Sequence, residues 1–107
     1  MAQDGLRASD QLLDQEQLNT ALSGQIIEFY DGSKSRFDVN GRYGYTYTDD
    51  SPVWAGDYHF GDDGQVCVDF DNGSSRCDLM VFSNERLTLI TTDGTRFPVR
   101  NQSVAPN

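Results

Sequence analysis

Five aromatic side chains with polar edges lie close together in this sequence: Tyr43, Tyr45, Tyr47, Trp54 and Tyr58. The three tyrosines at the start of this group are two residues apart, so on a β-strand they would share one face. Each ring offers a large apolar surface with a hydroxyl or N–H at its edge. We therefore take all five as candidate ligand-binding residues, lining a cavity or forming a platform for a sugar or a protein partner. The alternative is a row of core residues whose hydroxyls reach the rim of the core.

The two cysteines, Cys67 and Cys77, are spaced for a disulfide across a β-hairpin. Residues 71–73, Asp-Asn-Gly, suit a three-residue loop in which Gly73 takes the left-handed conformation of a G1 bulge. This loop pairs Cys67 with Cys77, whereas a two-residue loop would pair Cys67 with Asp78. We expect the bridge at a non-hydrogen-bonded pair, where opposed side chains are closest. Two cysteines and one histidine do not provide a four-ligand zinc site.

His59 is the only histidine, and Asp57 shares its face on the expected strand, so the two side chains could contact each other; the alternative is a half-exposed strand histidine. Nucleophilic catalysis would also need a serine or cysteine beside the histidine. The cysteines are expected to be oxidised, and the serines cluster in turns. We therefore predict no catalytic residue and no enzyme activity, and an openly exposed His59 would argue against catalysis.

The acidic loops raise the question of a metal site. The stretch that begins at Asp69 lacks the glycine at position six and the glutamate at position twelve of an EF-hand. Asp49-Asp50 and Asp62-Asp63 remain candidates for a weak Ca²⁺ site, but turn chemistry explains the same residues without an ion. The sequence predicts no cofactor and no resident metal.

Short strands separated by tight turns are the elements that must position these residues. Strands are expected at residues 25–30, 35–39, 42–48, 53–60, 65–70, 75–82, 86–92 and 95–100. Turns about every ten residues predict an all-β antiparallel meander of eight strands. Curling this meander, or closing it into a small barrel, would remove exposed edges. Alternation predicts the following core residues: Ile27, Phe29, Phe37, Val39, Tyr43, Tyr45, Tyr47, Trp54, Tyr58, Phe60, Leu87, Leu89, Phe97 and Val99.

The disulfide hairpin has two apolar faces in the expected register. One face carries Cys67, Cys77, Leu79 and Val81, and the other carries Val66, Val68, Phe70, Met80 and Phe82. The helix described below could cover one face, a partner subunit could cover one by forming a homodimer, or a bulge between Cys77 and Phe82 could relieve the conflict.

A short helix is expected at residues 14–23, before the first strand. Asp14 can cap its N-terminus, and Gln17 three positions later completes a capping box. Leu18 and Leu22 lie on one face, and Gly24 ends the helix. Since so short a helix is marginal alone, it must pack its apolar face on the sheet, at an open end or an edge.

The 107 residues suffice for one domain, expected at 13–100, with a flexible segment at 1–12 and a disordered tail at 101–107. The net charge is −9, with fourteen Asp and three Glu, so we expect no nucleic acid as a partner and no binding to anionic lipid. No apolar run approaches 18 residues, so no membrane span is expected. The acidic surface would suit a basic protein partner.

The start of the chain and the paired cysteines both favour export. Ala2-Gln3 is typical of the residues that flank a signal-peptidase cleavage site. Disulfides form and persist in oxidising compartments. We therefore expect a periplasmic or secreted protein whose signal peptide has been removed.

The order of these motifs resembles that of small exported proteins of alphaproteobacteria. The motifs are Leu18-x-x-x-Leu22-x-Gly24, an aromatic strand with Asp31-Gly32, Gly56-x-Tyr58, Val66-Cys67 and Arg76-Cys77. Those proteins have a helix ending in Leu-x-Gly, a Gly-x-Trp/Tyr strand and a paired-cysteine hairpin, and they are largely described as proteins of unknown function. In size, compartment and single disulfide, the chain is also similar to periplasmic β-barrel inhibitors of lysozymes and metalloproteases. This second similarity implies a barrel fold and an inhibitory role by analogy of fold alone.

These observations predict a small exported protein that binds without catalysis. The first expectation is a periplasmic inhibitor or interaction module, with a basic protein such as a lysozyme as its partner. The alternative is a carrier of a small hydrophobic or aromatic ligand in the barrel interior. Co-purification with a basic envelope protein would favour the module, whereas a deep cavity above roughly 300 Å³ would favour the carrier.

Overall fold

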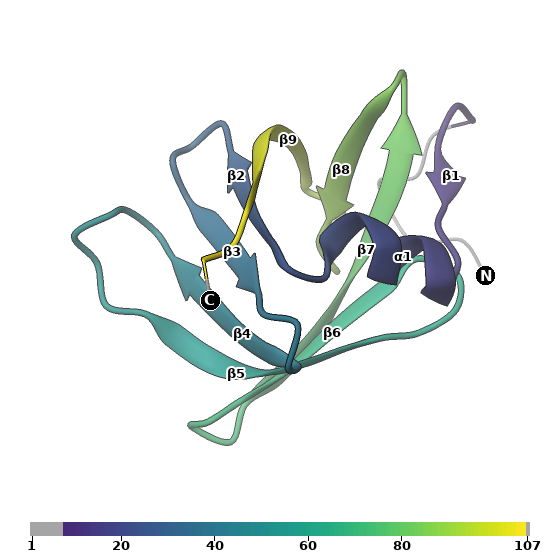
Figure 1. Cartoon of the computed structure of the whole chain (residues 1–107). Coiled ribbons are helices and arrows are strands. Elements are labelled where there is room, and N and C mark those ends of the chain that lie inside the picture. The colour runs from purple at the N-terminus through teal and green to yellow at the C-terminus, as the bar shows by residue number, and fades with distance from the viewer. Residues whose placement is uncertain (1–7, 107) are drawn as a thin grey trace.

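The computed structural model describes residues 8–106, which form one sheet and one short helix (Figure 1). The helix α1 (Gln15–Leu22) follows a first short strand in the chain. The strands are β1 (Gln11–Leu12), β2 (Gln25–Phe29), β3 (Lys34–Phe37), β4 (Arg42–Thr46), β5 (Trp54–Phe60), β6 (Gln65–Phe70), β7 (Ser75–Ser83), β8 (Arg86–Ile90) and β9 (Arg96–Val104).

Strands β2 to β9 form a closed antiparallel barrel. Each strand pairs with the next one in the chain, and β9 returns to pair with β2. The predicted all-β fold with one N-terminal helix is confirmed, and of the two expected arrangements the meander adopts the closed one. Closure gives each of these eight strands a neighbour on both sides. β1 adds an extra short strand beside β7, where Leu12 pairs with Val81.

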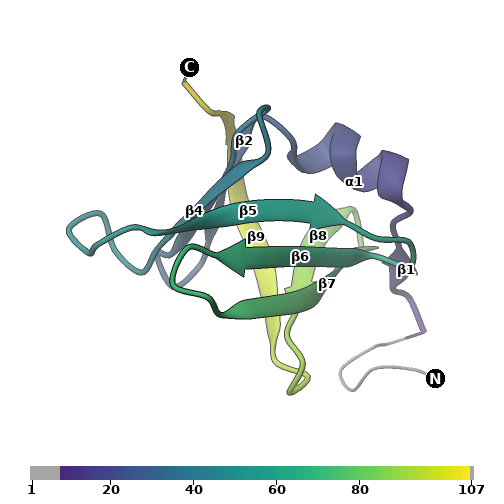
Figure 2. The same ribbon diagram turned by 90° about the horizontal axis from the view of Figure 1, so that it is seen from below.

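Helix α1 closes one end of the barrel. It lies on the side where β5 turns into β6, away from the β4–β5 and β6–β7 connections (Figure 2). Leu18 and Leu22 are 0% exposed and belong to the same core cluster as Ile27, Phe37 and Phe60. Side chains from the apolar face of the helix therefore fill the interior at this end of the barrel.

The helix begins and ends as its sequence predicts. The Asp14 carboxylate accepts a hydrogen bond from the Gln17 backbone N–H at 2.8 Å, and the Gln17 side-chain oxygen accepts one from the Asp14 N–H at 2.9 Å. This reciprocal capping box satisfies two N–H groups that helical hydrogen bonds leave free. At the other end Gly24, with φ of 78°, adopts the left-handed conformation that turns the chain into β2.

The predicted hairpin and its disulfide are confirmed. Cys67 pairs with Cys77 and Asp69 with Ser75, and the two cysteine Cα atoms are 4.1 Å apart. The Gly73 N–H donates to the Phe70 carbonyl at 3.0 Å, and Gly73 has φ of 93°, as the three-residue loop requires. The short Cα distance is that of a non-hydrogen-bonded pair.

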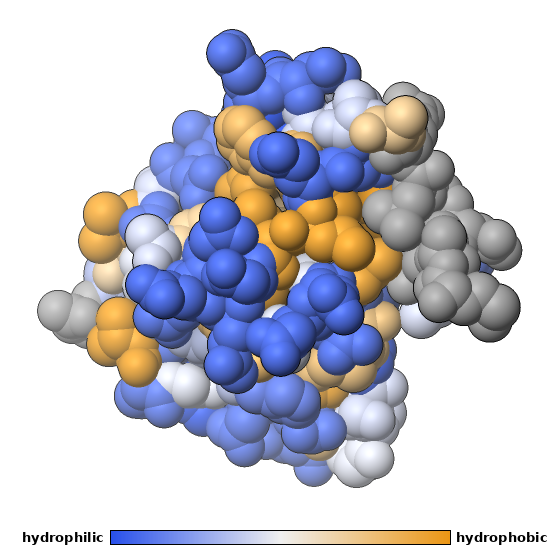
Figure 3. Space-filling model, turned by 90° about the vertical axis from the view of Figure 1, so that its right-hand side faces the viewer, coloured by the Kyte–Doolittle hydropathy of each residue, from blue (hydrophilic) through white to orange (hydrophobic). Residues whose placement is uncertain are grey.

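The two apolar faces of β7 lie on opposite sides of the barrel wall, one inside and one outside. Met80 points inward and joins the main core, while Leu79 and Val81 point outward and form a second buried cluster with Ile90. No register shift interrupts β7 within the described pairings, so the proposed bulge there is not needed. Hydrophobic side chains also gather on the face of the molecule that carries α1 and β1 (Figure 3). Phe82, at 38% exposure, is one large apolar residue that the fold leaves at the surface.

The chain near both predicted flexible ends is more regular than expected. Residues 11–12 form β1, and the Asp10 carboxylate before it contacts the Arg96 guanidinium at 2.7 Å, with the Asp10 side chain only 2% exposed. β9 continues to Val104, into the predicted tail, because its last residues pair with the first half of β2. Residues 1–7 and 107 lie outside the described part of the chain.

Alternation overestimates the core at three positions. Val39 is 75% exposed because β3 ends at Phe37 and Val39 lies in the following turn. Tyr47 is 60% exposed because β4 ends one residue earlier, and Trp54, the first residue of β5, is 47% exposed. Alternation places side chains correctly only within the paired part of a strand.

Candidate functional site

The end of the barrel opposite α1 contains a cavity of about 420 Å³. Residues from four connections line its mouth: Asp31 between β2 and β3, Tyr47 between β4 and β5, Asn72 between β6 and β7, and Thr91 between β8 and β9. These four connections lie at the same end, because successive strands of an antiparallel meander alternate in direction. The cavity is therefore the open half of the barrel interior.

Apolar side chains form the floor and most of the wall of the cavity. Ile27, Phe37 and Met80 line it and also belong to the core cluster that α1 packs against, so they separate the cavity from the closed end. Val68 and Leu89 are further lining residues, on opposite sides of the β7 strand in the sheet order. An apolar molecule that entered would exchange water for hydrocarbon and aromatic contacts.

A glycine allows two strands of the wall to approach each other closely. Gly56 of β5 lies between Tyr43 of β4 and Phe70 of β6 in the pairing register. A Cβ at Gly56 would lie 2.4 Å from the Asp69 carbonyl oxygen, too close for any side chain. The Tyr43 and Phe70 rings meet in an edge-to-face contact, with centroids 6.1 Å apart.

Polar groups on β3 and β4 interrupt the apolar wall. The Ser35 and Tyr43 hydroxyls are 2.8 Å apart, and both residues line the cavity. Burial raises the pKa of Tyr43 to about 12, so its hydroxyl stays protonated at neutral pH. Ser33, 2% exposed, donates from its backbone N–H and its hydroxyl to the Asp31 carboxylate, at 2.9 and 2.6 Å.

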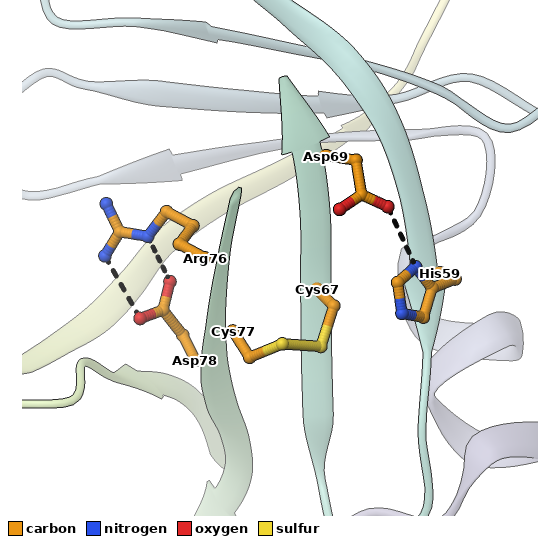
Figure 4. Close-up of a disulfide and its surroundings, with 6 residues drawn as sticks. All are labelled: His59, Cys67, Asp69, Arg76, Cys77 and Asp78. Carbon is orange, nitrogen blue, oxygen red and sulfur yellow. Dashed lines mark hydrogen bonds and ion pairs between the residues drawn. A yellow bond between two sulfur atoms is a disulfide. The ribbon is translucent and has the colours of Figure 1, made fainter. Parts of the chain in front are cut away.

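An ion pair on β7 faces the cavity. The Arg76 Nε donates to one Asp78 carboxylate oxygen at 2.9 Å, and Nη2 donates to the other at 3.0 Å. Both residues line the cavity, and their side chains lie on one side of β7 while Cys77 points to the other side, towards Cys67 (Figure 4). The Asp78 side chain is 9% exposed and that of Arg76 is 52% exposed, so the guanidinium presents a free side to the space. The hydrogen bonds that the Asp78 carboxylate accepts raise the pKa of Arg76.

The structure brings four of the five predicted aromatic residues to the cavity. Tyr43, Tyr45, Tyr47 and Trp54 all line it, and the Tyr45 and Tyr47 rings are edge to face at 5.1 Å between centroids. Tyr58 does not line it: its hydroxyl donates to the Asp38 carbonyl at 2.7 Å, near the helix-closed end. Their role in ligand binding stays a prediction.

Carboxylates surround the mouth. Hydrogen bonds from Ser33 lower the pKa of Asp31, and a hydrogen bond from the Thr91 hydroxyl is the main cause that lowers the pKa of Asp93. Asp71, in the β6–β7 connection, is paired with Arg42 at 2.7 Å, so its charge is balanced. The lowered pKa values keep the Asp31 and Asp93 carboxylates ionised at neutral pH, so a charged ligand would meet their field on entry.

His59 lies outside the barrel. Its side chain is 62% exposed, and its Nδ1 is 3.9 Å from a carboxylate oxygen of Asp69 rather than of Asp57, its predicted neighbour (Figure 4). Asp69 faces His59 from the next strand, because His59 and Cys67 are directly paired and Asp69 is two residues further. No serine or cysteine nucleophile is hydrogen-bonded to this histidine among residues 8–106, and both cysteines are oxidised.

Two further expectations from the sequence concern metal binding and membrane spans. Within residues 8–106, no three His, Cys, Asp or Glu side chains gather as a metal site would require, and this includes the two aspartate pairs at 49–50 and 62–63. None of the helices described is long and apolar enough to cross a membrane.

The polar residues of the cavity are those that sequence reasoning missed. Ser33, Ser35, Arg76 and Asp78 were not among the predicted site residues. One signal could have identified Arg76 and Asp78: the hairpin register places them on the same face as Val68 and Met80, where alternation predicts apolar residues. A charged pair at inward positions indicates that this part of the interior is not a purely apolar core.

Comparisons with known proteins found no relatives. No protein-family model matches the chain, and neither the curated proteins nor the solved structures contain a match.

Proposed function

We propose that this protein binds a small, mostly apolar ligand in the open half of its barrel and does so without catalysis. The observation that carries the proposal is the cavity of about 420 Å³. Cavities of roughly 300–1,000 Å³ with apolar walls and a few polar groups are typical of small-molecule sites. Of the two functions that the sequence predicts, this is the carrier.

The cost of leaving apolar walls in contact with water supports this proposal. Apolar surface that stays in contact with water forgoes the free energy that its burial would provide. The other end of the same barrel is filled by Leu18 and Leu22, so the fold can close an end when that is needed. An open end lined by aromatic side chains is what we expect of a barrel that binds a ligand there.

The alternative is an interaction module for a basic protein, which would use the outer surface. The observation in its favour is the net charge of −9. Recovery of one basic envelope protein in salt-sensitive co-purification would support it. A periplasmic or secreted location is part of both proposals, and the Cys67–Cys77 disulfide is its support.

The ligand proposal can be tested with the uncharged fluorescent probe N-phenyl-1-naphthylamine, whose emission rises in apolar surroundings. We expect saturable binding to the wild-type protein at pH 7. Energy transfer from Trp54 gives a second readout, because Trp54 is the only tryptophan and lines the cavity. Absence of saturable binding would contradict the proposal.

Two matched valine substitutions locate the probe. Val68→Phe places a ring in the cavity, where Val68 is 4% exposed, and should weaken probe binding at least ten-fold. Val104→Phe makes the same change at a residue that is 77% exposed on β9, and should leave binding unchanged. Equal affinities in the two variants, both confirmed as folded by circular dichroism, would place the probe elsewhere.

A further inference from the structure

We infer that the cavity selects a ligand whose polar end is uncharged, a hydroxyl or a carbonyl group on an apolar body. This inference rests on the proposed function and specifies its ligand. Two features of the cavity support it: the polar groups on its wall, and the charges that a ligand meets on its way in.

The cavity wall has hydrogen-bond donors to spare. Arg76 uses Nε and Nη2 on Asp78, and for its Nη1 no partner is found within residues 8–106. The same holds for the Tyr45 hydroxyl among those residues, and Tyr45 lines the same cavity as Arg76. A pure hydrocarbon would displace water from these donors and leave them unpaired, at a cost in binding free energy. A ligand oxygen would replace that water.

An anionic end group is disfavoured although an arginine is present. The charge of Arg76 is already balanced by the bidentate contact with Asp78. An anion would also pass the Asp31 carboxylate at the mouth, with Asp93 close by. Repulsion by these carboxylates opposes binding of a negative charge and slows its entry.

A cationic end group is attracted by the carboxylates at the mouth but is disfavoured at the cavity wall. Both carboxylate oxygens of Asp78 accept hydrogen bonds from Arg76, so a ligand ammonium would compete with an ion pair that is already formed. The guanidinium beside it would repel the ammonium, and repulsion is stronger where protein screens charges less than water does. Only an uncharged end group meets no like charge.

Matched ten-carbon competitors test the inference. Decan-1-ol, decanoate and decylamine differ only in the polar end, and each is titrated against bound N-phenyl-1-naphthylamine at pH 7 in 0.15 M salt. Decan-1-ol should displace the probe at a concentration at least ten-fold below those of the other two. Displacement by decanoate or by decylamine at an equal or lower concentration would overturn the inference.

Two variants show whether the wall residues cause the preference. Tyr45→Phe removes one hydroxyl from a half-buried ring and should weaken decan-1-ol several-fold more than it weakens the probe, which has no oxygen to accept from that hydroxyl. Arg76→Met/Asp78→Leu removes both charges together, so that neither is left unpaired, and should reduce the preference for decan-1-ol over decylamine, whose ammonium the guanidinium no longer repels. An unchanged preference in Tyr45→Phe and in the double variant would contradict the inference. If the double variant does not fold, Tyr45→Phe alone decides.

The failure of this inference differs from failure of the proposed function. Probe binding that Val68→Phe blocks, together with equal displacement by all three competitors, would sink only the choice of end group. Lack of probe binding to the wild-type protein would remove the ligand proposal itself.

Discussion

The two ends of this barrel are built on the same strands and are filled in opposite ways. At the closed end, Leu18 and Leu22 from α1 fill the interior. At the open end no helix from residues 8–106 enters, and a cavity of about 420 Å³ remains. Sheet closure alone therefore does not decide whether a small barrel is solid or hollow.

The strand residues change character along the barrel axis in step with this difference. On β3, the inward residues run from Ser35 to Phe37 towards the closed end, and on β7 they run from Arg76 and Asp78 to Met80. Polar inward residues lie where water or a ligand can reach them, and apolar ones lie where the helix excludes water. On these two strands, the change from apolar to polar inward residues marks the open end.

The largest expected effect comes from the same substitution at the two ends. Leu22→Ala at the closed end should lower the free energy of unfolding by about 3 kcal/mol, since it leaves a void in a fully buried site. Leu89→Ala in the cavity wall should cost less than about 2 kcal/mol, because Leu89 is only half-buried and removes less apolar area from water. Urea denaturation measures both values. Equal losses would mean that the open end is packed like the closed one.

The disulfide gives the next largest effect. Cys67→Ser/Cys77→Ser should lower the free energy of unfolding by about 2.8 kcal/mol, because the bridge no longer restricts the unfolded chain. The strand that carries Cys77 also carries Arg76 and Asp78, so probe affinity at the open end should fall as well. Treatment with a reducing agent should reproduce the change in the wild-type protein. Unchanged melting in both experiments would refute the stabilising role of the bridge.

Gly56 tests how closely the strands approach at the open end. Gly56→Ala should cost about 2 kcal/mol, because its Cβ would lie 2.4 Å from a backbone oxygen that cannot move away independently. Gly44→Ala on the adjacent strand is the control: its Cβ would meet only the Val53 side chain, at 3.1 Å, and should cost less than half as much. Thermal unfolding of both variants checks the difference, and a more stable Gly56→Ala protein would contradict this account of the wall.

Tyr43→Phe should change the stability least at neutral pH, and its specific effect should appear at alkaline pH. Its pKa is raised to about 12 in the folded state, from about 10 in the unfolded chain, so the stability that this shift provides is present below pH 10 and is lost as the pH rises towards 12. Tyr43→Phe should therefore flatten the decline of stability above pH 10, while Tyr47→Phe, at an exposed residue, should not. Denaturation between pH 9 and 11 measures this, and absorbance at 295 nm follows the ionisation. An identical decline in all three proteins would show that Tyr43 is not buried.

Much of this fold could be predicted from residues that act locally. The Asp14–Gln17 box fixed the helix start, and the loop at 71–73 fixed the register that pairs Cys67 with Cys77. Closure of the barrel could not be decided in advance, because it depends on β2 meeting β9 across most of the chain length. Such pairing between distant segments leaves no local sequence pattern.

The site was predicted in part for the same reason. Spacing two placed Tyr43 and Tyr45 on one face, and that face lines the cavity. Tyr58 shares the alternation but lies beyond the cavity floor, near α1, and no pattern within its strand gives its depth along the barrel axis. Depth depends on strand tilt and on where the helix enters, which only the assembled barrel determines.

The most direct test of the account is a nuclear Overhauser measurement between bound N-phenyl-1-naphthylamine and the methyl groups of the protein. The account predicts contacts from the probe rings to the methyls of Val68 and Leu89, and none to those of Leu18 and Leu22. Contacts only to outward residues such as Val104, or a probe that makes no contacts at all, would contradict a ligand site inside the open end.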